Sequence, residues 1–136
     1  MIRAALDTNV LVSALLTPKG APAGLLRAWQ SGAFELVTSE RLLRELEEVL
    51  QRPKFRRYLD AADIGDFVEM LRARAIVAPD PSEPAGVSKD PEDDHVIAVA
   101  IGGASVLVSG DDQMLGFRVP GLAILSPRAF LEVLEG

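Results

Sequence analysis

Short apolar runs alternate with longer amphipathic stretches along most of the chain, a pattern typical of a parallel sheet covered by helices. The short runs predict strands over residues 2–6, 34–37, 75–78, 105–108 and 122–125. The longer stretches predict helices over residues 21–30, 39–50, 60–74, 94–101 and 126–134. We therefore expect an α/β fold with three layers, α/β/α, around a central, mostly parallel sheet of four to five strands.

Proline and hydroxyl residues indicate where several of these elements begin and end. Pro22 suits the first turn of its helix, Ser39 is a candidate N-cap, and Ser126 with Pro127 begins the terminal helix. Pro53 prevents the helix that ends at residue 50 from continuing. The proline-rich residues 79–91 predict a loop, and residues 110–112 predict a turn.

Length and composition restrict the class of protein. The chain has 136 residues, of which 49% are hydrophobic and 25% charged, which fits one folded domain over residues 1–136 and excludes disorder. The best apolar run, residues 96–101, is too short to span a membrane, and the charged N-terminus does not fit a signal peptide. We therefore expect a cytoplasmic protein without membrane contact.

The composition also restricts the chemistry. The chain has no cysteine and one histidine, which excludes disulfides, thiolate zinc sites and cysteine nucleophiles. Its 14 Lys and Arg residues against 20 Asp and Glu residues give a net charge of −6, which by itself argues against a polyanionic partner. Polar chemistry must therefore depend on carboxylates, hydroxyls, amides, Lys and Arg.

Three aspartates occupy positions that a parallel sheet brings together. Asp7 follows the first predicted strand, Asp111 follows the fourth, and Asp94 begins a helix after an acidic loop. If the first and fourth strands are neighbours, their terminal carboxylates meet at one edge of the sheet. Clustered carboxylates repel one another unless cations neutralise them, and an all-oxygen site favours Mg²⁺ or Mn²⁺.

A fourth acid is expected on the helix at residues 39–50. Its apolar stripe leaves Glu45 at one border and Glu47 at the other, while Glu48 faces solvent. Either border residue can lean over the sheet, and periodicity does not choose between them.

Structural explanations compete with this interpretation. Asp7 can cap a helix that begins near Thr8, Asp111 can be a turn residue, and Asp94 can be an N-cap in an exposed acidic loop. His95 and Trp29 are assigned to structure, because no second histidine or nucleophile accompanies the histidine. The joint placement of the acids favours a metal site.

Five segments, in order along the chain, resemble those of PIN-domain nucleases. They are LDTNVLVSAL at residues 6–15, SERLLREL at 39–46, RPKF at 52–55, DPEDD at 90–94 and VSGD at 108–111. The resemblance implies a PIN-like fold and a hydrolase that cuts RNA with Mg²⁺ or Mn²⁺. Residue by residue, it implies four acids that bind metal and act in catalysis, and it selects Glu45 over Glu47: Asp7, Glu45, Asp94 and Asp111.

The resemblance also implies supporting residues and partners. Asn9 and Ser109 match positions where the family often has a supporting polar residue. Related proteins resemble VapC-type toxins, which commonly form homodimers and are held inactive by a small antitoxin protein. Gln113 departs from the family, because many relatives have an aspartate there, and this change can weaken metal occupancy or activity.

Basic residues gather on and after the Glu45 helix although the whole chain is acidic. Such a local basic stripe can guide phosphates to the metal site. The same residues can instead form a solvated surface or contact an acidic partner. The candidates for RNA binding are Arg41, Arg44, Arg52, Lys54 and Arg56.

The sequence therefore predicts a metal-dependent endoribonuclease, the toxin component of a toxin-antitoxin pair, that hydrolyses phosphodiester bonds with metal-activated water. One alternative is a phosphohydrolase with Asp7 as nucleophile, although Asn9 stands where such families place a second acid. Others are a receiver-like signalling module, for which no strand-end lysine is available, and a catalytically weak PIN-like module that binds RNA or protein.

Overall fold

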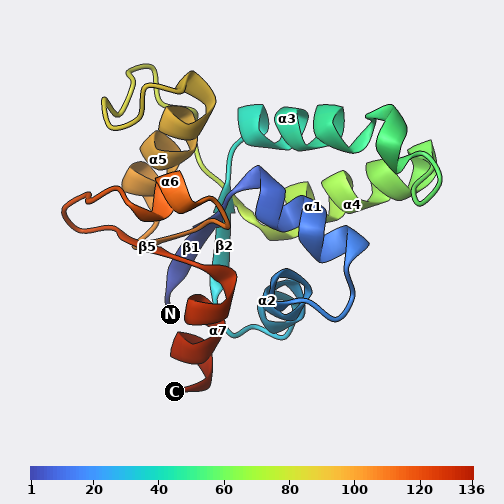
Figure 1. The fold of residues 1–136 in the computed structure, drawn as a ribbon, viewed down its shortest axis with the longest axis horizontal. Coiled ribbons are helices and arrows are strands. Elements are labelled where there is room, and N and C mark those ends of the chain that lie inside the picture. The colour runs from blue at the N-terminus through green and yellow to red at the C-terminus, as the bar shows by residue number, and fades with distance from the viewer.

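Five parallel strands form the central sheet of the computed structural model, which describes all 136 residues (Figure 1). The strands are β1 (Arg3–Leu6), β2 (Glu35–Thr38), β3 (Ile76–Val77), β4 (Val106–Val108) and β5 (Ala123–Leu125). Their order is β3-β2-β1-β4-β5, so β1 is central and pairs with both β2 and β4. The register pairs Leu6 with Val108, which places the ends of β1 and β4 side by side.

Helices cover both faces of the sheet, which confirms the three-layer architecture. They are α1 (Thr8–Leu16), α2 (Ala21–Gln30), α3 (Glu40–Leu50), α4 (Ala61–Arg74), α5 (Pro91–Gly103), α6 (Asp112–Leu115) and α7 (Pro127–Glu135), with a short 3₁₀ helix η1 (Pro53–Phe55) after α3. None of these helices is long and apolar enough to cross a membrane.

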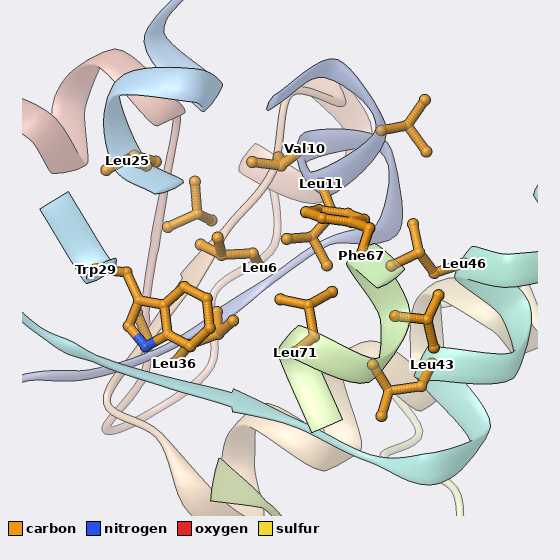
Figure 2. Packing of buried hydrophobic residues seen from close by; sticks show 14 of the residues in the cluster. Leu6, Val10, Leu11, Leu25, Trp29, Leu36, Leu43, Leu46, Phe67 and Leu71 are labelled. Atoms are coloured by element: carbon orange, nitrogen blue, oxygen red, sulfur yellow. The ribbon is translucent and has the colours of Figure 1, made fainter. Parts of the chain in front are cut away.

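The alternation of strand side chains divides the core in two. Ala4, Leu6 and Leu36 point to the larger cluster, formed with α1, α2, α3, α4 and α7 (Figure 2). Ala5, Val37 and Leu107 point to the opposite face, where α5 and α6 cover them. Because side chains alternate along a strand, consecutive residues of each strand bury themselves in different layers.

The chain leaves neighbouring strands toward opposite faces at the end of β1 and β4. After β1 it enters α1, which packs in the larger cluster, and after β4 it enters α6, whose Met114 packs in the other. Ligands in open parallel sheets bind where connections diverge in this way. The fold therefore places Asp7 and Asp111 at the edge where a ligand site is expected.

Three local predictions differ from the structure. Residues 8–16 form α1, which is not among the predicted helices. The sequence analysis mentions a helix near Thr8 only in the alternative in which Asp7 is its cap. Helix α5 begins at Pro91 rather than Asp94, because Asp90 caps it and proline fits a first helical turn. Residues 112–115 form α6, so a short helix begins at the last residue of the turn predicted for residues 110–112. The predicted caps are correct: the hydroxyls of Ser39 and Ser126 accept hydrogen bonds from the N–H groups of Leu42 and Ala129.

Candidate functional site

Asp7 lies at the centre of the site, at the carboxyl end of β1. Its side chain is only 7% exposed and makes no capping hydrogen bond to α1, so helix capping does not explain it. The Ser109 hydroxyl donates a hydrogen bond to Asp7 Oδ2 at 2.9 Å. The other carboxylate oxygen, Oδ1, accepts no hydrogen bond from a side chain.

Ser109 also connects the ends of the two central strands. Its Oγ accepts a hydrogen bond from the Asp111 N–H at 3.1 Å, while its hydroxyl hydrogen goes to Asp7. Asp111 Oδ1 accepts the Gln113 N–H at 2.9 Å and so caps α6. The structure thus brings Asp7, Ser109 and Asp111 together, and Asp111 has the turn role as well.

A cleft of about 210 Å³ opens beside Asp7. Helix α3 contributes Glu45 to this cleft, which resolves the choice that periodicity left open, since Glu47 is exposed elsewhere on the helix. Asn9 lines it from the first turn of α1. The remaining lining residues come from α1, α3, α5 and the segment after α3: Thr8, Val49, Arg52, Glu92, Asp93 and Val96.

Asp94, a predicted metal ligand, does not line this cleft. Its buried carboxylate accepts four backbone hydrogen bonds, from Ala85 and Gly86 on Oδ2 and from Val87 and Ser88 on Oδ1, at 2.8–3.2 Å. Burial alone raises the pKa of Asp94, but the four N–H donors together lower it below its usual value. The structure therefore gives Asp94 the task of organising the loop before α5.

Two acids of α5 line the cleft, Glu92 and Asp93, and the sequence analysis named neither of them as a candidate ligand. Asp93 lines the cleft with Asp7 and Glu45, and burial together with the charges of Asp90, Asp7 and Asp111 raises its pKa. One residue along a helix turns a side chain by about 100°, and Asp93 and Asp94 accordingly have different surroundings: Asp93 lines the cleft, whereas Asp94 binds the backbone of the preceding loop. The predicted helix begins at residue 94, whereas α5 begins at Pro91, so the prediction did not place Asp93 on the helix.

Burial and, to a smaller extent, mutual repulsion raise the pKa values of the acids in the site. Burial raises the pKa of Asp7, the Ser109 hydrogen bond opposes this, and the charge of Asp111 adds to it. Burial and the charges of Glu92 and Asp7 raise the pKa of Glu45 to about 7. None of the four carboxylates, those of Asp7, Glu45, Asp93 and Asp111, is in a salt bridge. The site therefore carries an excess of negative charge, which Arg41 and Arg52 offset only in part.

These carboxylates fit a hard divalent cation by donor type and by charge. Carboxylate oxygens are the ligands that Mg²⁺ and Mn²⁺ prefer, and a bound cation would offset the burial and the repulsion that raise the pKa values of these acids. No three of the acids lie close enough to hold an ion jointly as they stand. The arrangement is a set of donors around an open cleft rather than a closed coordination shell.

His95 has the structural role that the sequence analysis gave it. It is buried, and its Nε2 lies 2.8 Å from Asp80 Oδ1. Asp80 Oδ2 accepts the Arg41 N–H at 3.1 Å, so the same carboxylate joins the beginning of α3 to α5. Burial acts to raise the pKa of Asp80, but its hydrogen bonds, first that of Ser39, lower it.

The predicted RNA-binding residues lie along α3 and just after it, next to the acids of the site. Arg52 lines the cleft itself, and Arg41 and Arg44 line a neighbouring hollow with Glu45, Glu48 and Glu92. Lys54 Nζ lies 5.1 Å from the centre of the Phe55 ring, and Arg56 is exposed. The basic residues therefore adjoin the acids, although acids are interspersed among them on α3.

The raised pKa of Glu45 predicts a pH dependence of stability. Its value is about 7 in the folded protein against 4.5 without these neighbours, so the folded state binds more protons between these two pH values. The free energy of unfolding of the metal-free protein is therefore expected to fall as pH rises from about 4.5 to 7. Glu45→Gln should be more stable than the wild type at pH 8 and equal to it near pH 4.

Urea unfolding in EDTA over this pH range measures the difference between the two proteins. Glu48→Gln, an exposed position three residues later on the same helix, is the control, and its free energy of unfolding should follow that of the wild type. A difference between Glu45→Gln and the wild type that does not change with pH would contradict the prediction.

Comparisons with known proteins show the family of the chain and agree with its fold. Residues 3–113 match the family model of the PIN domain. A protein of Methanocaldococcus jannaschii, described as uncharacterized protein MJ1680, is 27% identical over 98% of this chain and 92% of its own.

Two solved structures have a similar fold. A chain of VapBC2 from Rickettsia felis, solved bound to a DNA fragment from their promoter, has a TM-score of 0.63 and 15% identity, over 92% of this chain and 98% of its own. PAE2754 from Pyrobaculum aerophilum has a TM-score of 0.63 and 18% identity, over 98% of this chain and 90% of its own. Because the family model covers most of the chain, from β1 into α6, this protein belongs to the PIN domain family.

Proposed function

We propose that the protein is a divalent-metal-dependent endoribonuclease, and that it is the toxin component of a toxin-antitoxin pair. The observation that carries the proposal is that Asp7, Glu45 and Asp93, none of them in a salt bridge, line one cleft at the β1–β4 edge. Asp111 does not line this cleft but is connected to Asp7 through Ser109. Membership of the PIN domain family and the likeness to a chain of VapBC2 support it. The proposed ligands are Asp7, Glu45, Asp93 and Asp111, with Asp93 in place of Asp94.

Ser109 and Arg52 have different parts in this proposal. When bound, Mg²⁺ or Mn²⁺ would activate water for hydrolysis and stabilise the charge that develops on a phosphodiester. Ser109 orients Asp7 through its hydrogen bond, which fixes the carboxylate before an ion arrives. Arg52 is the basic residue that lines the cleft, so it is the proposed contact for a substrate phosphate.

The proposed antitoxin partner follows from the fold likeness. The similar VapBC2 chain was solved with its promoter DNA, which supports a small antitoxin partner for this chain. We also propose that the protein acts as a homodimer on RNA in the cytoplasm. Gln113 lies exposed in the first turn of α6 next to Asp111, where it supplies no charge to a metal.

Cleavage of RNA by the purified protein tests the proposal. Single-stranded and hairpin RNA are incubated with the protein and Mn²⁺, Mg²⁺ or EDTA, and the product ends are mapped. We expect internal cleavage that requires the ion and stops in EDTA. Absence of cleavage with either ion, or cleavage that persists in EDTA, would contradict the proposed activity.

A further inference from the structure

The segment after α3 combines positive charge with aromatic rings. Residues 51–59, QRPKFRRYL, contain four basic residues and no acid. None of these four is in a salt bridge, so their charges are free to meet another molecule. Two of the seven aromatic residues of the chain, Phe55 and Tyr58, also lie here.

Backbone hydrogen bonds and the core hold this segment in place. The N–H groups of Tyr58 and Leu59 both donate to the Phe55 carbonyl at 3.0 Å, and the Arg56 N–H donates to the Pro53 carbonyl at 3.2 Å. Phe55 packs against the larger core cluster. Tyr58, by contrast, is 65% exposed and is the only aromatic side chain among the exposed large hydrophobic residues. A firm turn therefore presents one exposed ring among cations.

The segment also continues the candidate site. Arg52 lines the acidic cleft, and η1 begins at the next residue. Along α3, Glu45 and Gln51 are separated by about 9 Å of helix. In Figure 1 the segment follows α3 at the end that lies away from α5. A nucleic-acid strand whose phosphate reaches the cleft can thus continue along these residues.

We propose that residues 52–58 form a platform on which an unpaired RNA base stacks against Tyr58 while the neighbouring cations bind the backbone. The proposal rests on the proposed ribonuclease function and adds a residue that favours unpaired RNA. Stacking on an aromatic ring requires a base that is free of its helix, whereas phosphate contacts do not distinguish single from double strands. Charge complementarity selects a polyanion as the occupant over an apolar protein surface.

Binding of labelled RNA, measured by fluorescence anisotropy, tests the platform. A single strand and its duplex are titrated with protein in EDTA and again in Ca²⁺, so that binding is recorded without dependence on Mn²⁺ cleavage. Tyr58→Ala is expected to weaken single-strand binding about tenfold and to leave duplex binding unchanged. Tyr58→Phe, which keeps the ring, should bind as the wild type does. Val133→Ala removes an exposed side chain from α7 and is the matched control.

The cations of the platform have a separate signature. Arg56→Ala with Arg57→Ala should weaken both RNAs and flatten the dependence of log Kd on log salt by roughly 0.7 for each lost single-strand phosphate contact.

Several results would overturn the platform. They are wild-type binding by Tyr58→Ala, equal weakening of single strand and duplex by that variant, or no RNA binding in either condition. A change in oligomeric state with unchanged RNA binding would also overturn it and would assign Tyr58 to a protein interface. Tyr58-dependent binding without any Mn²⁺-dependent cleavage would instead refute only the proposed activity. Mn²⁺-dependent cleavage together with RNA binding that does not depend on Tyr58 would refute only the platform.

Discussion

Asp94→Asn is expected to lower the free energy of unfolding by about 3 kcal/mol. The buried carboxylate accepts four backbone N–H groups, two on each oxygen. An asparagine keeps one acceptor oxygen, and its NH₂ group faces two N–H donors that lose their partners. Each buried hydrogen bond to a charged group contributes roughly 1.5–3 kcal/mol, so the loss of two is large. Urea unfolding at pH 7 measures the effect.

The pH dependence of Asp94 gives an independent check. Because its pKa is lowered in the folded protein, its contribution is present above the unfolded pKa of 3.8 and is lost as pH falls through the folded value. The difference in stability between wild type and Asp94→Asn should therefore shrink in strong acid.

Asp93→Asn is the matched control one residue away. Asp93 is half-buried among like charges that raise its pKa, so neutralising it should leave stability equal or higher. The same change removes a proposed metal ligand, and Mn²⁺-dependent cleavage should fall by on the order of 100-fold or more, beyond the loss typical of an outer-shell partner. If Asp94→Asn instead kept its stability and lost cleavage while Asp93→Asn cut normally, Asp94 would be the ligand after all.

This pair of aspartates shows where sequence reasoning reached its limit. The side-chain period of a helix locates an acid only when the first residue of the helix is known. Pro91 was assigned to the loop, yet proline is a good first helical residue, and α5 therefore begins three residues earlier than predicted. The four amides that hold Asp94 come from a loop whose path no periodicity describes.

Other parts of the site were predictable because they follow from topology. The pairing of β1 with β4 confirms that the strands before Asp7 and Asp111 are neighbours. The amphipathic pattern of α3 limits the fourth acid to Glu45 or Glu47, which lie at the two borders of its apolar stripe. Glu45 is the one of the two that lines the cleft. The helix α1 was not among the predicted elements, because its apolar run carries no cap signal apart from Asp7 itself.

Asp7→Asn is expected to abolish Mn²⁺-dependent RNA cleavage, with a loss on the order of 100-fold or more. Asparagine can still accept the Ser109 hydrogen bond at 2.9 Å, so the geometry of the strand end should persist while the charge disappears. Removing that charge also weakens Mn²⁺ binding, which isothermal titration calorimetry measures without reference to activity.

The same substitution should stabilise the metal-free protein at pH 8. Burial raises the pKa of Asp7, so its ionised form is unfavourable in the folded state, and the amide removes this penalty. Asp66→Asn, on the exposed side of α4, is the control and should change neither cleavage nor melting temperature. A gain in stability together with a loss of cleavage would identify Asp7 as a group that is retained for chemistry at the expense of folding. Retained Mn²⁺-dependent cleavage by Asp7→Asn would remove Asp7 from the proposed metal site, and with it the reason for placing that site at the β1–β4 edge.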